Sequence, residues 1–164
     1  MDFDQADAVN QAIRLLSLRH RARIAELLVP LGLHPGQEAV VLELARTGPM
    51  IQAQLSQALN VEPPSVTLMT RKLEASGHLR RTAAPADKRA SVVELTDRGR
   101  ALAEQVRRLW CELAEETVAG LPAPALAGLP GLLTAMADNV DARGARRRGG
   151  RREPDQDRGS QSVA

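Results

Sequence analysis

Aromatic residues are almost missing from this chain, which has one Phe, one Trp and no Tyr among its 164 residues. Cysteine is as scarce, and a single thiol, Cys111, excludes an internal disulfide and is typical of a reducing cytoplasm. No apolar run approaches the roughly 18 residues that a membrane-spanning helix needs, and the acidic first ten residues do not resemble a secretory signal. With 43% hydrophobic and 26% charged residues, the sequence predicts a folded, soluble, cytoplasmic protein.

Patterns of catalysis and of metal or cofactor binding are missing as well. The three histidines, His20, His34 and His78, stand alone, without the Cys/His spacing of metal ligands. No nucleophile with a neighbouring base, no phosphate-binding loop and no pair of carboxylates is recognisable. We therefore expect no enzyme activity, no cofactor and no metal.

Positive charge is concentrated in two segments, although the net charge is only +2. Residues 62–100 carry 8 basic and 5 acidic side chains, and residues 141–164 carry 7 and 4. Residues 1–61, with 5 and 6, and residues 101–140, with 2 and 5, are slightly acidic. This distribution suits a polyanionic partner that meets the middle of the chain.

Apolar residues recur at helical spacing along most of the chain. They predict six helices, at about residues 6–29, 36–46, 52–59, 63–76, 97–119 and 124–140. We expect Pro35 in the first turn of the second helix, and we expect Pro130 and Gly131 to kink the last helix or delay its start. Residues 141–164 are rich in Gly and charge, which predicts a disordered tail with basic and acidic stretches.

The third and fourth predicted helices are separated by a very short joint. Asn60 in this joint is one of the few residue types other than Gly that tolerate a left-handed backbone. Pro63 and Pro64 follow, and both fit only the first turn of a helix because they have no N–H to donate. The pattern indicates a helix-turn-helix.

Two short extended runs come next, at residues 78–83 and 91–95, on either side of the polar turn 84–90. They predict a β-hairpin, after which Thr96 is suited to cap the following helix. The order of elements predicts a mainly α protein with a small β-hairpin, that is, a winged helix-turn-helix.

Such a unit suits duplex DNA, because an α-helix fits the major groove, where each base pair presents its own pattern of donors, acceptors and methyl groups. Helix 63–76 carries the short polar residues Ser65 and Thr67 near its start and the cations Arg71 and Lys72 one turn later. At the tip of the hairpin, Arg89 can enter the minor groove, and Asp87 can hold its guanidinium in place. We expect DNA contacts from Pro64, Ser65, Thr67, Leu68, Arg71, Lys72, Lys88 and Arg89.

The stretches "LSQALNVEPPSVTLMTRKLEASGHLRR" and "PADKRASVVELTDRG" resemble the MarR family of bacterial winged-helix transcriptional regulators. The pairing of Asp-x-Arg-Ala/Ser with Leu-Thr-x-x-Gly is the specific part of this resemblance, which extends along residues 6–140. It implies a homodimer, formed by intertwined helices at about 6–29 and 97–140, with a DNA-binding region at about 36–96. It also implies a repressor that a small aromatic or anionic ligand releases from a palindromic operator.

Three positions depart from the family's pattern. Leu68 stands where the family usually has a basic residue, so the phosphate or base contact that a cation would make at this position is not expected. Glu62 replaces the usual Asp cap before the recognition helix, and Ile51 replaces a Thr or Ser cap before the preceding helix. Each change of cap is expected to cost on the order of 1 kcal/mol of local helix stability.

Other residues carry hypotheses of lower specificity. Arg14, Arg19, His20 and Trp110 are candidates for a ligand pocket, whose walls would be mainly aliphatic because aromatics are so few. Cys111 is expected to be a buried, inert thiol, with a redox sensor as the alternative. The arginines between Arg143 and Arg152 either add non-specific attraction to DNA or form a solvated end.

A winged helix-turn-helix can also serve as a protein–protein interaction module without specific DNA binding. The positive charge of residues 62–100 favours DNA over this alternative.

Overall fold

Helices make up most of the residues that the structure, a computed structural model, describes, namely 1–83 and 91–149. The chain divides into two units, Met1–Thr117 and Val118–Ala164. The helices of the first unit are α1 (Phe3–Leu28), the 3-10 helix η1 (Val29–Leu31), α2 (Gln37–Thr47), α3 (Gln52–Leu59), α4 (Pro63–Ala75) and α5 (Asp97–Val118, whose last residue falls in the second unit). The second unit holds α6 (Ala123–Gly149). The predicted winged helix-turn-helix is confirmed.

The sheet has three strands, one more than the predicted hairpin. Strands β2 (Leu79–Ala83) and β3 (Ser91–Leu95) pair antiparallel, with Arg81 opposite Val93. On its other side β3 pairs with β1 (Met50–Ile51), so β3 is central. We did not predict β1, because two residues are too short to show the alternation by which a strand is recognised.

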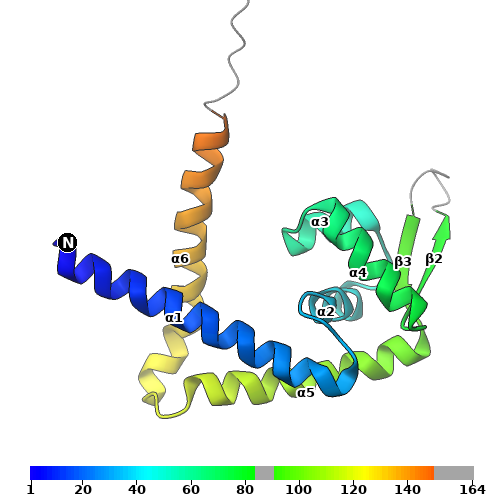
Figure 1. Cartoon of the computed structure of the whole chain (residues 1–164), viewed down its shortest axis with the longest axis horizontal. Coiled ribbons are helices and arrows are strands. Elements are labelled where there is room, and N and C mark those ends of the chain that lie inside the picture. The colour runs from blue at the N-terminus through cyan, green and yellow to red at the C-terminus, as the bar shows by residue number, and fades with distance from the viewer. Residues whose placement is uncertain (84–90, 150–164) are drawn as a thin grey trace, which may run out of the picture. The chain divides into compact units, whose positions relative to one another are not determined.

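The core of the first unit lies where α2, α3 and α4 meet β3, as Figure 1 shows for the ribbons. Its centre consists of fully buried aliphatic side chains, namely Leu28, Val40, Val41, Leu55, Val66, Leu73, Val93 and Val106. These residues come from α1, α2, α3, α4, β3 and α5. The core therefore joins the helix-turn-helix to both long helices.

Helix α1 shows the opposite pattern, because only its last residue, Leu28, is buried in the protomer. Earlier apolar side chains on α1 are between 42% and 57% exposed, namely Val9, Ile13, Leu15, Leu16 and Leu18. The C-terminal half of α1 is tied to α5 by Arg23, whose Nη2 lies 2.7 Å from Glu116 Oε1. The N-terminal half of α1 thus carries apolar side chains that the rest of the first unit does not cover.

Two expectations about helix boundaries were wrong. Pro35 lies before α2, which starts at Gln37 after a left-handed Gly36 (φ 97°). Helix α6 begins at Ala123, close to the predicted start, and contains Pro130, so the proline does not delay its start and the alternative, a kink, stays a prediction. The helix also continues to Gly149, where we predicted disorder from residue 141 onward. Ala and Arg, which dominate residues 142–148, are strong helix formers, and local propensity outweighed the lack of apolar residues there.

Cys111 is exposed in the protomer, which contradicts the expected buried thiol. The buried residues of α5 include Val106 and Leu113, which lie on one face two turns apart. Cys111 precedes Leu113 by two residues, or about 200° around the helix, so it points away from the core. The position of Cys111 around the helix, rather than the general preference of Cys for burial, therefore determines the exposure of its thiol.

Within the described residues, no single helix is both long and apolar enough to cross a membrane. Only α5 taken together with the first part of α6 reaches that length and composition, and the two are interrupted between Val118 and Ala123.

The first turn of α5 packs unusually closely on the corner between α4 and β2. A Cβ atom added to Gly99 would lie 2.0 Å from the carbonyl oxygen of His78. That oxygen also accepts the backbone N–H of Thr96 at 3.0 Å, so it is held in place. Thr96 caps α5 as predicted, because its Oγ1 accepts the N–H of Gly99 at 3.1 Å.

We expect Gly99→Ala to lower the free energy of unfolding by about 1–3 kcal/mol, because the new methyl must displace backbone rather than a flexible side chain. The matched control is Gly128→Ala in α6, where an added Cβ meets nothing within 4 Å. The control should be neutral or stabilising by up to about 1 kcal/mol. Urea unfolding of both variants is the measurement, and equal midpoints would contradict the close contact.

Candidate DNA-binding surface

The turn between α3 and α4 has the geometry that the sequence predicted. Asn60 is left-handed (φ 50°), the only residue other than Gly with a positive φ among those described. Its N–H donates to the Gln57 carbonyl at 3.1 Å, and Ser56 Oγ donates to the Val61 carbonyl at 2.5 Å. Helix α4 then starts at Pro63, and Glu62 makes no side-chain cap, as expected. The turn closes with its polar groups paired.

Helix α4 has one buried and one exposed face. Val66, Thr70 and Leu73 are fully buried. The exposed side carries five of the predicted DNA contacts, namely Pro64, Ser65, Leu68, Arg71 and Lys72. Their spacing of three or four residues brings them together over two turns of helix. The structure therefore gathers the predicted residues of α4 on one surface, with the exception of Thr67.

Thr67 is half-buried, and its hydroxyl is already engaged. It donates to the Pro63 carbonyl at 2.9 Å and accepts Gln52 Nε2 at 2.5 Å. Thr67 thus joins α4 to the start of α3 and has less capacity for a base than the sequence suggested.

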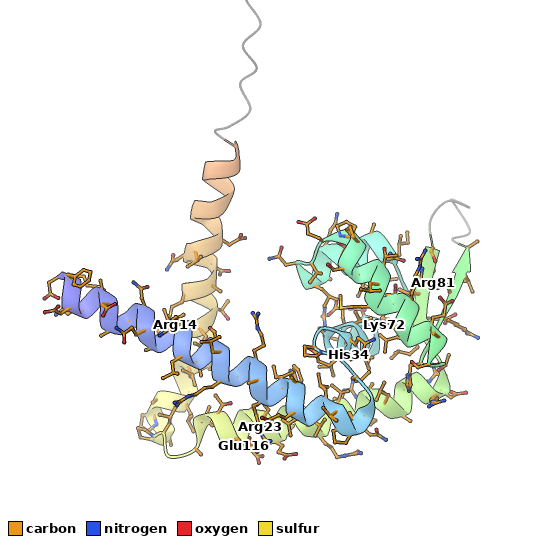
Figure 2. The ribbon with its side chains drawn as sticks, viewed as in Figure 1. Arg14, Arg23, His34, Lys72, Arg81 and Glu116 are labelled. Carbon is orange, nitrogen blue, oxygen red and sulfur yellow. The ribbon has the colours of Figure 1, made fainter. Side chains whose placement is uncertain are left out.

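Arg81 on β2 is a residue that the sequence analysis missed. Its Nη2 donates to Thr70 Oγ1 at 2.7 Å, its Nη1 donates to Gln52 Oε1 at 3.3 Å, and its Nε lies 3.0 Å from Glu74 Oε2. Figure 2 shows this side chain beside α4. One guanidinium therefore ties the wing to both helices of the helix-turn-helix.

A signal for this role was present in the sequence. Arg80 and Arg81 are consecutive in a strand, so their side chains must point to opposite sides of the sheet. Arg81, which shares the side of the buried Leu79, is 20% exposed, whereas Arg80 is 66% exposed. Arg80 instead pairs across the sheet with Glu94 at 2.6 Å, and this hydrogen bond lowers the pKa of Glu94.

The tip of the wing, with Asp87, Lys88 and Arg89, lies outside the described residues. The strands that support it are described up to Ala83 and from Ser91. The predicted roles of these three residues at the tip stay predictions.

The base of the wing contains a buried histidine. His78 is 9% exposed, and its Nδ1 lies 2.8 Å from Ser76 Oγ. Burial, together with the positive charge of Arg98, lowers the pKa of His78. Of the other histidines, His34 is exposed and His20 half-buried.

A pocket of about 490 Å³ lies between α2, β3 and α5. Its lining includes Leu44, Ala103, Arg100 and Arg107. Arg100 donates to the Leu95 carbonyl at 2.9 Å, and Arg107 pairs with Glu104 at 2.5 Å. None of the four predicted ligand residues lines it, since Arg14, Arg19 and His20 lie on α1 and Trp110 packs against the core from α5. Figure 2 shows Arg14 on α1.

Comparisons with known proteins agree with this geometry. The MarR family model matches residues 33–91. The HTH-type transcriptional regulator YwoH of Bacillus subtilis is 33% identical over 111 residues, which are 68% of this chain and 77% of YwoH.

Two solved structures are similar to this chain over most of their length. A cysteine-to-serine mutant of MarR from E. coli, in complex with operator DNA, superposes with a TM-score of 0.72 at 27% identity, over 83% of this chain and 99% of that one. BpsR of Bordetella bronchiseptica, whose DNA binding is regulated by 6-hydroxynicotinic acid, gives a TM-score of 0.72 at 25% identity, over 79% and 98%.

We expect Arg81→Ala to lower the free energy of unfolding by about 1–3 kcal/mol, because it leaves Thr70, Gln52 and Glu74 without a half-buried cationic donor. Arg80→Ala is the matched control, as it removes a neighbouring but exposed ion pair that contributes little to stability. Urea unfolding compares the two. Equal losses would show that Arg81 does not join the wing to the helices.

Stability should also fall as the solution becomes more acidic. Because the pKa of His78 is lower in the folded state than its usual 6.5, the unfolded chain binds more protons below neutral pH. The stability that neutral His78 contributes is therefore present above pH 6.5 and lost as pH falls through 6.5 toward the folded-state pKa. Melting temperatures at pH 7.5 and 5.5 should differ less for His78→Gln than for wild type, and a control at the exposed His34 should keep the wild-type difference.

Proposed function

Since the chain belongs to the MarR family of transcriptional regulators, we propose that it binds specific sites in double-stranded DNA through α4 and the wing. The observation that carries this proposal is the exposed face of α4, on which Ser65, Leu68, Arg71 and Lys72 lie together while the opposite face is buried. A rigid helix with donors and cations on its free side has the shape and charge that the major groove accepts.

Arg71 and Lys72 are the cations of α4 that we assign to DNA. Both are exposed, and neither is needed by the core. Arg71 has the planar donor set that reads guanine or clamps a phosphate, whereas Lys72 supplies a point charge. Arg81 supports them indirectly, because it fixes α4 relative to α3 and β2.

The wing is proposed to enter the adjacent minor groove. Arg89 would insert at the tip, Asp87 would restrict its rotamers, and Lys88 would contact phosphate. The support for these roles is the sequence motif and the strands that lead to it, β2 and β3.

We propose that the protein acts as a homodimer. The uncovered apolar residues of α1, among them Ile13 and Leu16, would be covered by a second copy, as a two-fold interface requires. Two copies of α4 then favour a palindromic operator with half-sites about one helical turn apart. The DNA complex of E. coli MarR supports this mode of binding.

Repression relieved by a small aromatic or anionic ligand is the proposed regulation, and the control of BpsR by 6-hydroxynicotinic acid supports it. Two places can hold such a ligand. One is the pocket with Arg100 and Arg107, whose volume is in the range of ligand sites. The other is the predicted set of Arg14, Arg19, His20 and Trp110, which a second protomer would complete. We also propose that the protein acts in the cytoplasm and is not an enzyme.

We expect Arg71→Ala to weaken operator binding by about 1–3 kcal/mol and Arg89→Ala to do the same, whereas Lys88→Ala should mainly reduce the slope of affinity against salt by about 1. The measurement is a gel shift or anisotropy titration at several salt concentrations with a duplex selected by the wild-type protein. Arg46→Ala is the control, because this exposed cation lies on α2 and pairs with Glu43 of the same helix.

Two outcomes would contradict the proposal. Wild-type affinity of Arg71→Ala or Arg89→Ala would remove that residue from the interface. A protein that shows no salt-dependent binding to any duplex would favour the interaction module without specific DNA binding. In the same titration, small aromatic acids such as 6-hydroxynicotinic acid should release the DNA. The variants Arg107→Ala and Arg14→Ala distinguish the two candidate ligand sites, because only the variant of the occupied site should lose this release.

A further inference from the structure

Leu68 is an exposed apolar side chain in the middle of the outward face of α4. It is 56% exposed, whereas the other large apolar residues of this helix, Val66, Met69 and Leu73, are buried or packed against the core. Its side chain therefore contributes little to the fold of the protomer. Its neighbours on the helix surface are Ser65 one turn before and Arg71 and Lys72 one turn after.

We propose that Leu68 is a specificity-determining residue that contacts the C5-methyl group of a thymine in each half-site of the operator. The inference rests on the proposed binding of α4 to DNA and adds to it the base that one position reads. Leu has no hydrogen-bonding atoms, and the thymine methyl is the apolar group that a base pair presents in the major groove. A leucine held there makes a favourable apolar contact with the thymine methyl. Opposite any other base, it leaves the hydrogen-bonding groups of the base edge without a partner.

The surroundings of Leu68 support an apolar contact at this point. The hydroxyl of the adjacent Thr67 is occupied by Gln52 and by the Pro63 carbonyl. Gln52 is occupied in turn by Arg81. Thr67 and Gln52 thus serve the fold, while Arg71 and Lys72 would bring phosphate and base edges close enough for the leucine to be desolvated.

A leucine at position 68 changes the balance between affinity and sequence selectivity, compared with a basic residue at the same position. A basic side chain at this position would add a charge contact that strengthens binding to many sequences and steepens its salt dependence. Leu68 adds no charge, and it strengthens binding only when thymine is the base that it contacts. We therefore infer that the operator of this protein has a thymine at one defined position of each half-site.

The test starts from duplexes that the wild-type protein selects from a random library. Each thymine of the selected site is then replaced by uracil, which removes only the methyl group. At one position in each half-site we expect uracil to weaken binding by about fourfold, the loss for one buried methyl group. Uracil at the other thymines should change the affinity by less than about twofold.

Variants assign the methyl contact to a residue. In Leu68→Ala the uracil penalty at that position should disappear, because the shorter side chain does not reach the base. In Leu68→Lys it should also disappear, while the salt dependence becomes steeper. Leu68 is exposed, so both variants should unfold at the wild-type urea concentration, which is measured alongside.

Three results would overturn the inference, and they differ from a failure of the proposed function. The first is selective DNA binding with no uracil-sensitive thymine. The second is a uracil penalty that persists in Leu68→Ala, and the third is a penalty that is lost in Pro64→Ala instead. If no duplex is selected at all, the DNA-binding proposal itself fails.

Discussion

Burial of one face of α4 fixes the orientation of the surface that we propose to bind DNA. Val66, Thr70 and Leu73 are fully enclosed by the core, so the helix can neither rotate nor slide without exposing them. The position of every outward side chain, Leu68 and Arg71 included, follows from this packing. Hydrophobic burial supplies the stability, and the exposed face is left free for recognition.

Polar contacts give that packing a single register. Arg81 connects β2 with Gln52 on α3 and with Thr70 and Glu74 on α4, and Thr67 adds a second tie between the two helices. Apolar surfaces alone tolerate small shifts, whereas a guanidinium that contacts three side chains favours one arrangement of them. These contacts hold β2, α3 and α4 together.

A similar constraint joins these elements to the long helix α5. The contact between Gly99 and the His78 carbonyl, with Thr96 bonded to the same corner, leaves no room for a side chain. The start of α5 is thus held against the base of the wing.

The helices of the helix-turn-helix, the left-handed Asn60, the hairpin strands and the cap at Thr96 could be predicted from the sequence, because each depends on neighbours within a few residues. The sequence also placed Ser65, Leu68, Arg71 and Lys72 on one helix face. The partners of Arg81, the engagement of Thr67, the third strand β1 and the exposure of Cys111 followed only from the folded chain. The first three arise from partners that are distant in sequence, 29 residues apart for Arg81 and Gln52 and 43 for Met50 and Val93. The last depends on which side of α5 the core occupies. Local pattern cannot specify which distant groups meet, since that depends on how the whole core closes.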